Sequence, residues 1–328
     1  MKKNVAIVAG GDSSEIVISL KSAAGLSTFI DKERYNLYIA ILKKSEWVVQ
    51  LPDGTNTAID KNDFSFQENG FIKKFDFAYI TIHGTPGEDG RLQGYFDMIG
   101  MPYSSCNALV SAITFNKYVC NGYLRGFGVK VADSIRLFRG QTADTDEVVA
   151  RLGLPLFVKP NVGGSSFGTT KVKAAAGLQD AIAKAFAEGD EVIMEQFVAG
   201  KEVTSGCYKT KESSVLLPLT EVVTGNDFFD FDAKYNGQVE EITPARISVE
   251  MTKKIQNETS RIYDLLGASG IIRIDYIIPQ NGEPVMLEVN TTPGMTATSF
   301  IPQQIRAAGL DIKNVMTEII EDVLLKRK

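Results

Sequence analysis

Two short stretches decide the fold of this chain: residues 271–278 read IIRIDYII, and residues 285–290 read VMLEVN. Both are apolar runs in which polar side chains recur at every second position, the period of a β-strand. The link between them, residues 279–284, reads PQNGEP and is rich in turn formers. An antiparallel β-hairpin is therefore predicted, with the two strands side by side.

This hairpin aims four polar side chains at one place. Arg273 and Asp275 share one face of the first strand. Glu288 and Asn290 share one face of the second. Two carboxylates and an amide oxygen beside an arginine suit Mg²⁺ and a phosphate, because Mg²⁺ prefers a few oxygen ligands and leaves room for nucleotide oxygens. The alternative is a salt-bridged pair of strands on a solvated face.

The composition indicates a globular protein with two or three domains. The chain has 328 residues, of which 44% are hydrophobic, and a net charge of −5, so nucleic acid is not expected as a partner. We find neither an apolar run of the roughly 18 residues that a membrane span needs nor a secretory signal, and expect no membrane association. Three widely spaced cysteines fit neither a disulfide framework nor a zinc site, which predicts a reducing cytoplasm.

The first third of the chain has the pattern of an α/β domain. Residues 5–9 form a buried strand of the parallel type, a glycine loop follows, and residues 15–29 form a helix. We therefore predict an α/β protein whose N-terminal domain is built on a parallel sheet. Residues 53–70 are polar and without clear period, so surface turns are expected there.

Two further units follow. The second begins near residue 105 with a helical stretch over residues 108–127, and contains a strand that ends in Lys159 and Pro160. The third begins near residue 194. Its predicted elements are a strand over residues 203–208, a helix over 250–266, the hairpin, and a closing helix over 312–325.

A glycine-rich loop is the candidate phosphate site. Residues 163–168 read GGSSFG and offer unencumbered backbone N–H groups beside the hydroxyls of Ser165 and Ser166. Lys159 precedes the glycines, whereas the Walker lysine follows them. A plain connector is the alternative, and the predicted metal hairpin favours the phosphate role.

Two candidate substrate residues lie near the N-terminus. Glu15 opens a helix, where it either complements the helix dipole or binds a substrate ammonium group at the C-terminal edge of the sheet. His83, the only histidine, begins the loop HGTPGEDG after an apolar strand. A lone histidine is usually structural, but its place in the same half-domain as Glu15 favours the wall of an active site.

One aromatic segment is ambiguous. Residues 228–235 read FFDFDAKY and mix acids with aromatics without a clear period. The segment is either an edge strand with buried phenylalanines or a loop that closes over the site and carries Lys234 and Tyr235 inward.

Taken together, these segments resemble the D-alanine–D-alanine ligases of the ATP-grasp superfamily. The resemblance covers almost the whole chain, and the ordered set of motifs is far more specific than any single one. The motifs are Gly10-Gly11 with Ser14-Glu15, His83-Gly84 with Gly87-Glu88-Asp89-Gly90, Lys159-Pro160, Gly164-Ser165-Ser166, Ala233-Lys234-Tyr235, Arg273-Ile274-Asp275, Glu288-Val289-Asn290 and Pro293-Gly294-Met295-Thr296.

The resemblance implies an ATP-grasp architecture of three domains: an N-terminal substrate-binding domain over residues 1–105, a central domain over 106–194 and a C-terminal domain with the metal site over 195–328. It implies that two D-alanine molecules are condensed through an acyl phosphate, with ATP and two Mg²⁺ ions, and with Mn²⁺ as an alternative metal. Such enzymes supply the dipeptide to peptidoglycan precursors in the bacterial cytoplasm and are typically homodimers.

The resemblance also implies roles for residues on the nucleotide side. Asp275, Glu288 and Asn290 would hold the metal ions, since catalysis of phosphoryl transfer is largely charge neutralisation and positioning. The nucleotide-binding residues would be Lys117 and Lys159 at the phosphates, Lys234 at the γ-phosphate, Glu202 at the ribose hydroxyls, and Ser166 and Glu195.

On the substrate side, the resemblance implies groups that hold the amino acids and stabilise an oxyanion. These would be Glu15 at the first ammonium group, Ser165 and Tyr235 linking Glu15 to two closing loops, Arg273 and the N–H of Gly294 at the oxyanion, His83 in the wall, and Ser299 with Phe300 at the second substrate.

The sequence departs from the family pattern beside these substrate residues. Ile16 and Val17 stand where a basic and an acidic residue are usual, which bears on the support of Glu15. Phe300 stands where leucine is common, which bears on the acceptor pocket. Two alternatives stay open: a related ligase with D-serine, D-lactate or another amino acid as acceptor, and a non-catalytic relative that binds nucleotide. Tyr235 argues against D-lactate, because that tyrosine accompanies the dipeptide enzymes.

Overall fold

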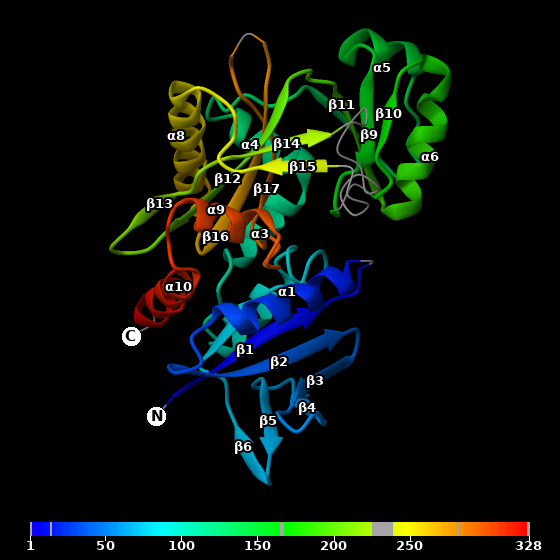
Figure 1. Ribbon diagram of the computed structural model, residues 1–328. Helices are drawn as coiled ribbons and strands as arrows, with labels where there is room; N and C mark the ends of the chain where they lie inside the picture. The colour runs from blue at the N-terminus through cyan, green and yellow to red at the C-terminus, as the bar shows by residue number, and fades with distance from the viewer. Residues whose placement is uncertain (1, 14, 165–166, 225–238, 281, 327–328) are drawn as a thin grey trace.

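The computed structural model describes residues 2–13, 15–164, 167–224, 239–280 and 282–326 (Figure 1). Within these ranges the strands form three sheets, of seven, four and six strands. The seven-stranded sheet lies in the N-terminal third and the other two lie above it in Figure 1. The α/β class predicted from the sequence is confirmed.

The N-terminal sheet is mixed. Its strands are β1 (Lys3–Gly10), β2 (Tyr35–Lys43), β3 (Glu46–Gln50), β4 (Asn56–Asp60), β5 (Ser65–Glu68), β6 (Phe71–Lys73) and β7 (Phe77–Ile80), in the spatial order β6-β5-β4-β3-β2-β1-β7. β1 pairs in parallel with β2 and β7, whereas β2 to β6 form an antiparallel meander. The predicted parallel sheet is therefore corrected to three parallel strands extended by the meander.

Part of that meander lies where surface turns were predicted. β4 and β5 fall within residues 53–70, and Phe64 and Phe66 are buried there against Phe75. The prediction was wrong because the two strands are only five and four residues long, too short for their alternation to register. Phe64 also has a φ of 58° in the turn between them, which breaks the period.

Both faces of the N-terminal sheet are buried. α1 (Ile16–Phe29) packs on one face, and α2 (Arg91–Ile99) packs with aromatic side chains on the other. Successive residues of β1 therefore enter different clusters: Ile7 belongs to the α1 side and Val8 to the α2 side. Burial on both faces explains why β1 reads as a continuous apolar run.

The four-stranded sheet is antiparallel, in the order β10-β9-β11-β8. Apolar residues of two helices, α5 and α6, form one core with its strands. Its elements are β8 (Ser134–Phe138), α5 (Thr145–Leu152), β9 (Leu156–Pro160), β10 (Thr170–Val172), the 3₁₀ turn η1 (Ala175–Gly177), α6 (Leu178–Glu188) and β11 (Glu191–Gln196).

The six-stranded sheet contains the predicted hairpin. β16 (Ile271–Ile278) and β17 (Val285–Asn290) pair antiparallel, which confirms the prediction. The strand order is β15-β14-β12-β16-β17, with β13 also paired to β12. The remaining strands are β12 (Lys201–Lys209), β13 (Ser214–Leu216), β14 (Thr220–Thr224) and β15 (Val239–Ile242), and the helices that pack on the sheet are α3 (Ala108–Phe115), α4 (Lys117–Arg125), α8 (Val249–Leu266) and α9 (Phe300–Ala307).

The single helix predicted over residues 108–127 is two helices, α3 and α4. Asn116 lies between them with φ −90° and ψ 100°, and its side chain accepts a hydrogen bond from the backbone N–H of Val119. Asparagine is a strong N-cap residue, because its side-chain oxygen satisfies an unpaired N–H at the helix start. The break puts Lys117 at the first position of α4.

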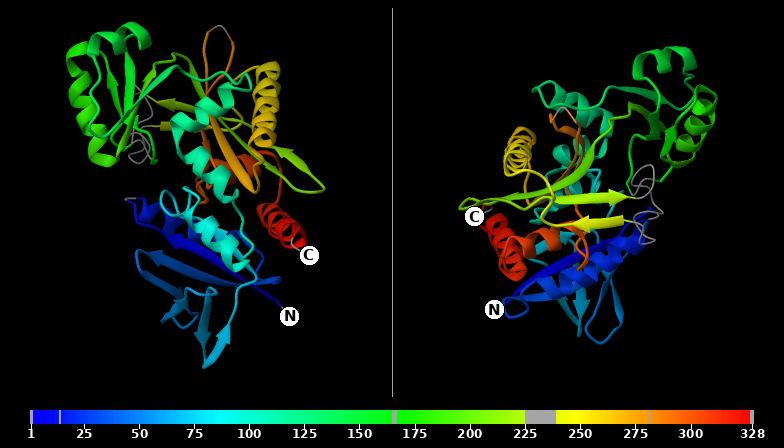
Figure 2. Two further views of the ribbon diagram at one scale, coloured as in Figure 1. Left: turned by 180° about the vertical axis from the view of Figure 1, so that it is seen from behind. Right: turned by 45° about the horizontal axis from the view of Figure 1, so that its top comes forward.

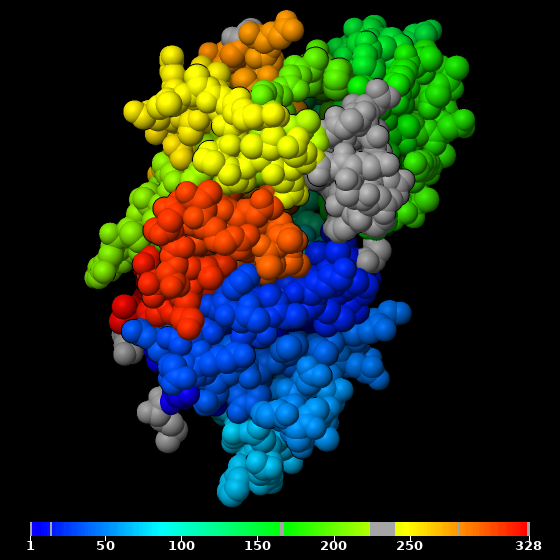
Figure 3. Space-filling model, viewed as in Figure 1, coloured from blue at the N-terminus to red at the C-terminus, as the bar shows by residue number. Residues whose placement is uncertain are grey.

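One hydrophobic core joins the two ends of the chain. Ile7 of β1, Leu26 of α1 and Ile301 of α9 belong to the same buried cluster. The last helix, α10 (Ile312–Lys326), packs against α1 (Figure 2). In the space-filling view, the C-terminal segment lies directly against the N-terminal part (Figure 3). This shared core fixes the N-terminal sheet relative to the hairpin.

Two expectations from composition can be compared with the structure. Among the described helices, none is both long and apolar enough to cross a membrane. Cys106, Cys120 and Cys207 are free thiols buried in the core. Burial raises the pKa of each thiol to about 12, so these cysteines are packing residues with little thiolate character.

Gly25 provides a test of the packing of α1. A Cβ added there would lie 2.2 Å from the backbone oxygen of Met295, so Gly25→Ala should push α1 away from that loop. We expect it to lower the free energy of unfolding by about 1–3 kcal/mol, measured by urea denaturation.

Gly94→Ala in α2 is the matched control, because no described atom beyond its own helix lies within 4 Å of the added Cβ. There the gain in helix propensity should raise stability by about 0.5–1 kcal/mol. Equal effects of the two substitutions would contradict the close contact at Gly25.

Candidate active site

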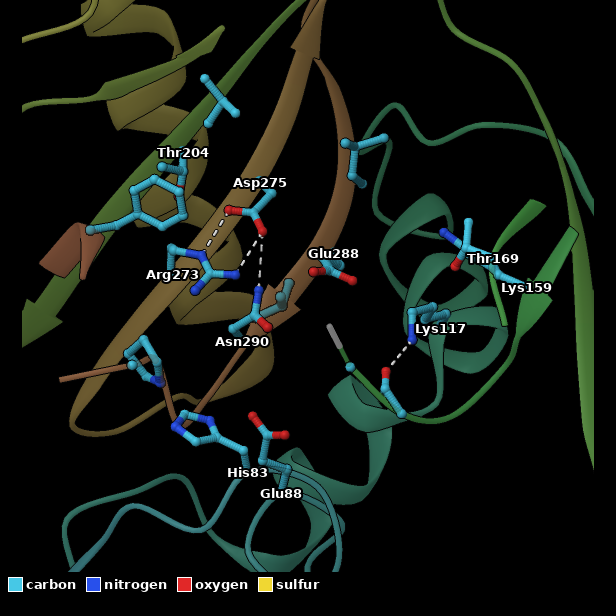
Figure 4. Close-up of a pocket in the computed structure, with 18 of the residues that line it drawn as sticks. His83, Glu88, Lys117, Lys159, Thr169, Thr204, Arg273, Asp275, Glu288 and Asn290 are labelled. Carbon is cyan, nitrogen blue, oxygen red and sulfur yellow. Dashed lines mark hydrogen bonds and ion pairs between the residues drawn. The ribbon is translucent and has the colours of Figure 1, made fainter. Parts of the chain in front are cut away.

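A cavity of about 1190 Å³ lies where the three sheets meet. Figure 4 shows His83 and Glu88 on its lower side, Lys117 and Lys159 on another side, and the hairpin residues above. All predicted site residues that the structure describes line this cavity: Glu15, His83, Lys117, Lys159, Glu195, Glu202, Arg273, Asp275, Glu288, Asn290, Gly294, Ser299 and Phe300.

Four predicted site residues lie outside the described residues: Ser165, Ser166, Lys234 and Tyr235. Their roles stay predictions. The glycine loop is nevertheless placed up to Gly164, which lines the cavity.

The hairpin brings its four polar side chains together through its register. Asp275 is paired with Glu288 and Arg273 with Asn290 across the two strands. Arg273 holds Asp275 in a two-pronged ion pair, in which Nε and Nη2 each lie 2.9 Å from a different carboxylate oxygen. Nδ2 of Asn290 donates to the same carboxylate at 3.2 Å. The four groups thus form one cluster, as the strand period predicted.

The electrostatics of this cluster keep Arg273 charged. Burial would lower the pKa of Arg273, but Asp275, with Glu288 and Glu88, raises it well above its ordinary value. The guanidinium also lies over the ring of Phe300, 5.4 Å from its centroid. Arg273 is therefore a fixed positive charge with a face against an aromatic ring.

Two lysines converge on the opposite side of the cavity. Lys159 of β9 forms a 2.5 Å ion pair with Glu195 of the adjacent strand β11, two residues along from Ile193, the direct partner of Lys159 across the sheet. Lys117, at the start of α4, donates to the backbone oxygen of Gly163 at 2.6 Å. Burial would lower the pKa of Lys159, but Glu195 and Glu288 raise it, whereas burial lowers the pKa of Lys117. Both cations suit phosphate oxygens.

Glu15 lies against the glycine loop. A Cβ added at Gly164 would stand 3.0 Å from both carboxylate oxygens of Glu15, so only glycine allows this approach without displacement. Glu15 is 9% exposed and directly precedes α1. The carboxylate is thereby held at the C-terminal edge of β1, where open α/β sheets bind ligands. Ile16 and Val17, the two departures beside it, do not line the cavity.

The loop after β7 adds His83 and Glu88. Burial, together with the charge of Arg273, lowers the pKa of His83 to about 4. Burial and the neighbouring Glu15 raise the pKa of Glu88 to about 8. The backbone N–H of Gly84 donates to Oε2 of Glu88 at 2.7 Å. At neutral pH this corner therefore holds a neutral imidazole and a largely protonated carboxyl group.

Glu88 is the cavity residue that the sequence analysis missed. It was quoted within the GEDG motif but given no role. The signal was its distance of five residues from His83 in one short glycine-rich loop, which returns its side chain to the same wall.

The loop before α9 forms the remaining wall. Ser299 Oγ accepts from the backbone N–H of Thr296 at 3.0 Å and lies 2.8 Å from the Thr296 hydroxyl. A Cβ added at Gly294 would stand 3.0 Å from Ser299 Oγ. Gly294, Ser299 and Phe300 therefore form one compact turn beside Arg273.

The hairpin side chains fit a hard divalent cation. Asp275 and Glu288 offer carboxylate oxygens on one face, and Asn290 offers an amide oxygen, the donors that Mg²⁺ prefers. Among the described residues, no group of three or more His, Cys, Asp and Glu side chains forms a metal site. A cation here would therefore need Asn290 and the oxygens of a bound phosphate as ligands.

Two family models match the chain. The model of the D-ala D-ala ligase N-terminus matches residues 4–106, and the model of the D-ala D-ala ligase C-terminus matches residues 123–321. The chain belongs to the D-alanine–D-alanine ligase family. Its class, an ATP-dependent ligase, follows from this membership, as the resemblance predicted.

Curated relatives match over the full length. The chain is 75% identical over 328 residues to the D-alanine–D-alanine ligase of Parabacteroides distasonis, covering 100% of this chain and 99% of the relative. It is 65% identical over 322 residues to the ligase of Bacteroides fragilis strain YCH46, covering 98% of this chain and 99% of the relative.

Solved structures share the fold. The VanG D-Ala:D-Ser ligase from Enterococcus faecalis superposes with a TM-score of 0.88 at 31% identity, covering 98% of this chain and 100% of that one. The Bacillus anthracis D-alanine–D-alanine ligase complexed with ATP superposes with a TM-score of 0.79 at 28% identity, covering 99% and 98%. The predicted ATP-grasp architecture is confirmed.

The raised pKa of Glu88 makes a prediction about stability and pH. Between the unperturbed value of 4.5 and about 8, the folded protein binds a proton on Glu88 that the unfolded chain has lost. Stability contributed by this group is therefore lost as pH rises through that window. Glu88→Gln removes this titrating group. The free energy of unfolding of the variant, relative to that of the parent, should therefore increase as the pH is raised from about 5 to about 8.

Urea denaturation of the ligand-free protein at several pH values measures this difference, with Glu33→Gln on the exposed surface as the control substitution. A constant difference between the Glu88→Gln variant and the parent across the window would show that the carboxyl group is not protonated in the folded state.

Proposed function

We propose that this ligase joins two molecules of D-alanine into D-alanyl-D-alanine at the expense of ATP, and supplies the dipeptide to peptidoglycan precursors. The observation that carries the proposal is that Glu15, the two lysines and the polar side chains of the hairpin line one and the same cavity. An amino acid whose ammonium group contacts Glu15 can then place its carboxylate among the cations.

In the first step, a carboxylate oxygen of the first D-alanine attacks the γ-phosphorus of ATP. The bond to the β,γ-bridging oxygen breaks, which gives an acyl phosphate and ADP. Lys117 and Lys159 would hold the phosphates and Glu15 the ammonium group, so that three charged side chains fix the reacting atoms in one geometry. Glu202, which lines the cavity from β12, would bind the ribose hydroxyls.

In the second step, the amine of the second D-alanine loses a proton and attacks the acyl carbon. The resulting tetrahedral oxyanion collapses, inorganic phosphate leaves, and the peptide bond remains. Arg273 is the permanent positive charge of the cavity wall, and the backbone N–H of Gly294 lies in the adjacent turn, so these two would stabilise the oxyanion. Ser299 and Phe300 would bound the site of the second substrate.

The proposal includes two Mg²⁺ ions, or Mn²⁺, held by Asp275, Glu288 and Asn290. Bound there, the ions would neutralise phosphate oxygens during transfer. The register of the hairpin supports this placement, because it pairs Asp275 with Glu288 and Arg273 with Asn290, so that the three oxygen-bearing side chains meet at one place.

The remaining parts of the proposal come from the family resemblance. They are a homodimer in the bacterial cytoplasm and a division into domains over residues 1–105, 106–194 and 195–328. They also include links from Ser165 and Tyr235 to two closing loops, and nucleotide contacts of Ser166, Glu195 and Lys234, the last at the γ-phosphate.

A coupled assay of ADP release over a panel of D- and L-amino acids tests the function. D-Alanine alone should stimulate ATP turnover, with the dipeptide formed in equal amount. D-Serine and D-lactate, each offered with D-alanine, test the alternative acceptors. If no amino acid stimulates ATP turnover, the ligase function is contradicted and only the non-catalytic alternative remains.

Glu288 is the first residue to test. Glu288→Gln removes one anionic metal ligand and weakens the hold on metal and phosphates together, so we expect ligation to be abolished with the fold unchanged by circular dichroism. Glu283→Gln, an exposed glutamate in the turn of the same hairpin, is the matched control and should keep full activity. Normal turnover of Glu288→Gln at ordinary Mg²⁺ would remove Glu288 from the site.

Arg273 should act mainly on the transition state, since its charge is needed most when the oxyanion develops. Arg273→Ala should therefore lower kcat by about 10² or more and raise the KM for ATP far less. Arg261→Ala, in an exposed ion pair on α8, is the control. An unchanged kcat with weaker ATP binding would give Arg273 a ground-state role instead.

A further inference from the structure

His83 is anchored by a serine of α1 that the proposed function does not use. Ser22 is fully buried, and its Oγ lies 3.4 Å from Nε2 of His83. The same Oγ accepts a hydrogen bond from the backbone N–H of Met295 at 3.3 Å. Ser22 therefore connects α1, the loop after β7 and the loop before α9 at one atom.

The hydrogen-bond capacity of Ser22 favours one of the two positions for the proton on the His83 imidazole. A serine hydroxyl has one hydrogen to donate and lone pairs to accept with. The Met295 N–H takes one lone pair of Ser22 Oγ, and the second could accept from a protonated Nε2. Among the described residues, Nε2 of His83 is the only other hydrogen-bond partner of this hydroxyl. If Nε2 were protonated, the Ser22 hydrogen would therefore be buried without an acceptor among them, so donation from Ser22 to Nε2 is the favoured arrangement.

A hydrogen accepted by Nε2 requires that Nε2 be unprotonated. In a neutral imidazole the proton then lies on Nδ1. Nε2 is turned toward the buried side of α1, so Nδ1 is the nitrogen left to the cavity that His83 lines. Across the described residues, no hydrogen bond to Nδ1 is found. Its N–H thus has no acceptor in the described part of the chain.

We propose that Ser22 is a positioning residue that locks His83 as the Nδ1–H tautomer, so that this N–H donates to an anionic oxygen of the bound amino-acid substrates. The chemical class of the ligand is a carboxylate or acyl-phosphate oxygen that Arg273 also attracts. The substrate contact rests on the proposed function, whereas the tautomer does not.

The surroundings explain why a neutral donor is useful here. The imidazole stays uncharged across the physiological range, because burial and Arg273 lower its pKa to about 4. A second fixed cation beside Arg273 would repel it, whereas a neutral N–H adds a directed hydrogen bond without adding charge. Glu88 of the same loop lies on the same wall of the cavity as His83 (Figure 4).

The single histidine makes the tautomer directly measurable. In protein labelled with ¹⁵N-histidine, the imidazole of one residue gives all the ring-nitrogen signals. Long-range ¹H–¹⁵N correlation spectra of the ligand-free enzyme should show a protonated Nδ1 and an unprotonated Nε2. The spectra should not change between about pH 6 and pH 8, the range in which an ordinary histidine loses its charge. A protonated Nε2 in the parent enzyme overturns the proposal, whatever the activity.

Ser22→Ala tests the coupling between the serine and the ring. Without the Ser22 hydroxyl, both tautomers of His83 should be populated. The KM for D-alanine should rise roughly threefold to tenfold, the effect of losing one hydrogen bond. The KM for ATP should stay unchanged. Ser111→Ala, a fully buried helical serine that bonds the backbone oxygen of Cys106, is the matched control and should change neither the spectrum nor the KM.

The two parts of the proposal fail separately. A locked Nδ1–H tautomer that persists in Ser22→Ala overturns the role of the serine. A lost tautomer with an unchanged KM for D-alanine overturns the substrate contact. Absence of ligation in the parent enzyme, with the tautomer as expected, contradicts only the proposed function.

Discussion

The ion pair between Arg273 and Asp275 is the interaction on which the rest of the site depends. Both side chains come from one face of β16, and Asn290 reaches the same carboxylate from β17. Removing either partner would leave an uncompensated charge in a cavity wall, which commonly costs about 3–5 kcal/mol. The cluster therefore requires that the β16–β17 register be held, because a slip of β17 by one residue would turn Glu288 and Asn290 to the other face, away from the pair.

The second requirement is the shared core between the two ends of the chain. Glu15, directly before α1, lies against the glycine loop. Ser22 in the middle of α1 contacts His83 and Met295, and Gly25 packs against Met295 as well. Because α1 packs in one buried cluster with α9 and α10, the N-terminal sheet cannot shift without moving the hairpin side of the site. Substrate position and the proposed metal position are thereby set by the same packing.

Strand period predicted the hairpin, because it alone fixes which side chains of residues 271–278 and 285–290 share a face. Residues such as Lys117, Glu202 and Ser299 followed from the family resemblance instead, and their roles stay predictions. The sequence did not predict the antiparallel meander, since β4 and β5 are too short to show a period. It also missed the break at Asn116, where a polar residue inside an apolar helix pattern looks like an ordinary surface position. Glu88 was missed because a role for it depends on the fold of its glycine-rich loop, which no local pattern specifies.

The hairpin register would create a metal site that faces the phosphates. Anomalous diffraction from Mn²⁺, in crystals grown with a non-hydrolysable ATP analogue, locates such a site directly. Anomalous density is expected at bonding distance from the side-chain oxygens of Asp275, Glu288 and Asn290, next to the phosphate chain. Manganese bound to the analogue but away from all three side chains would contradict this metal site.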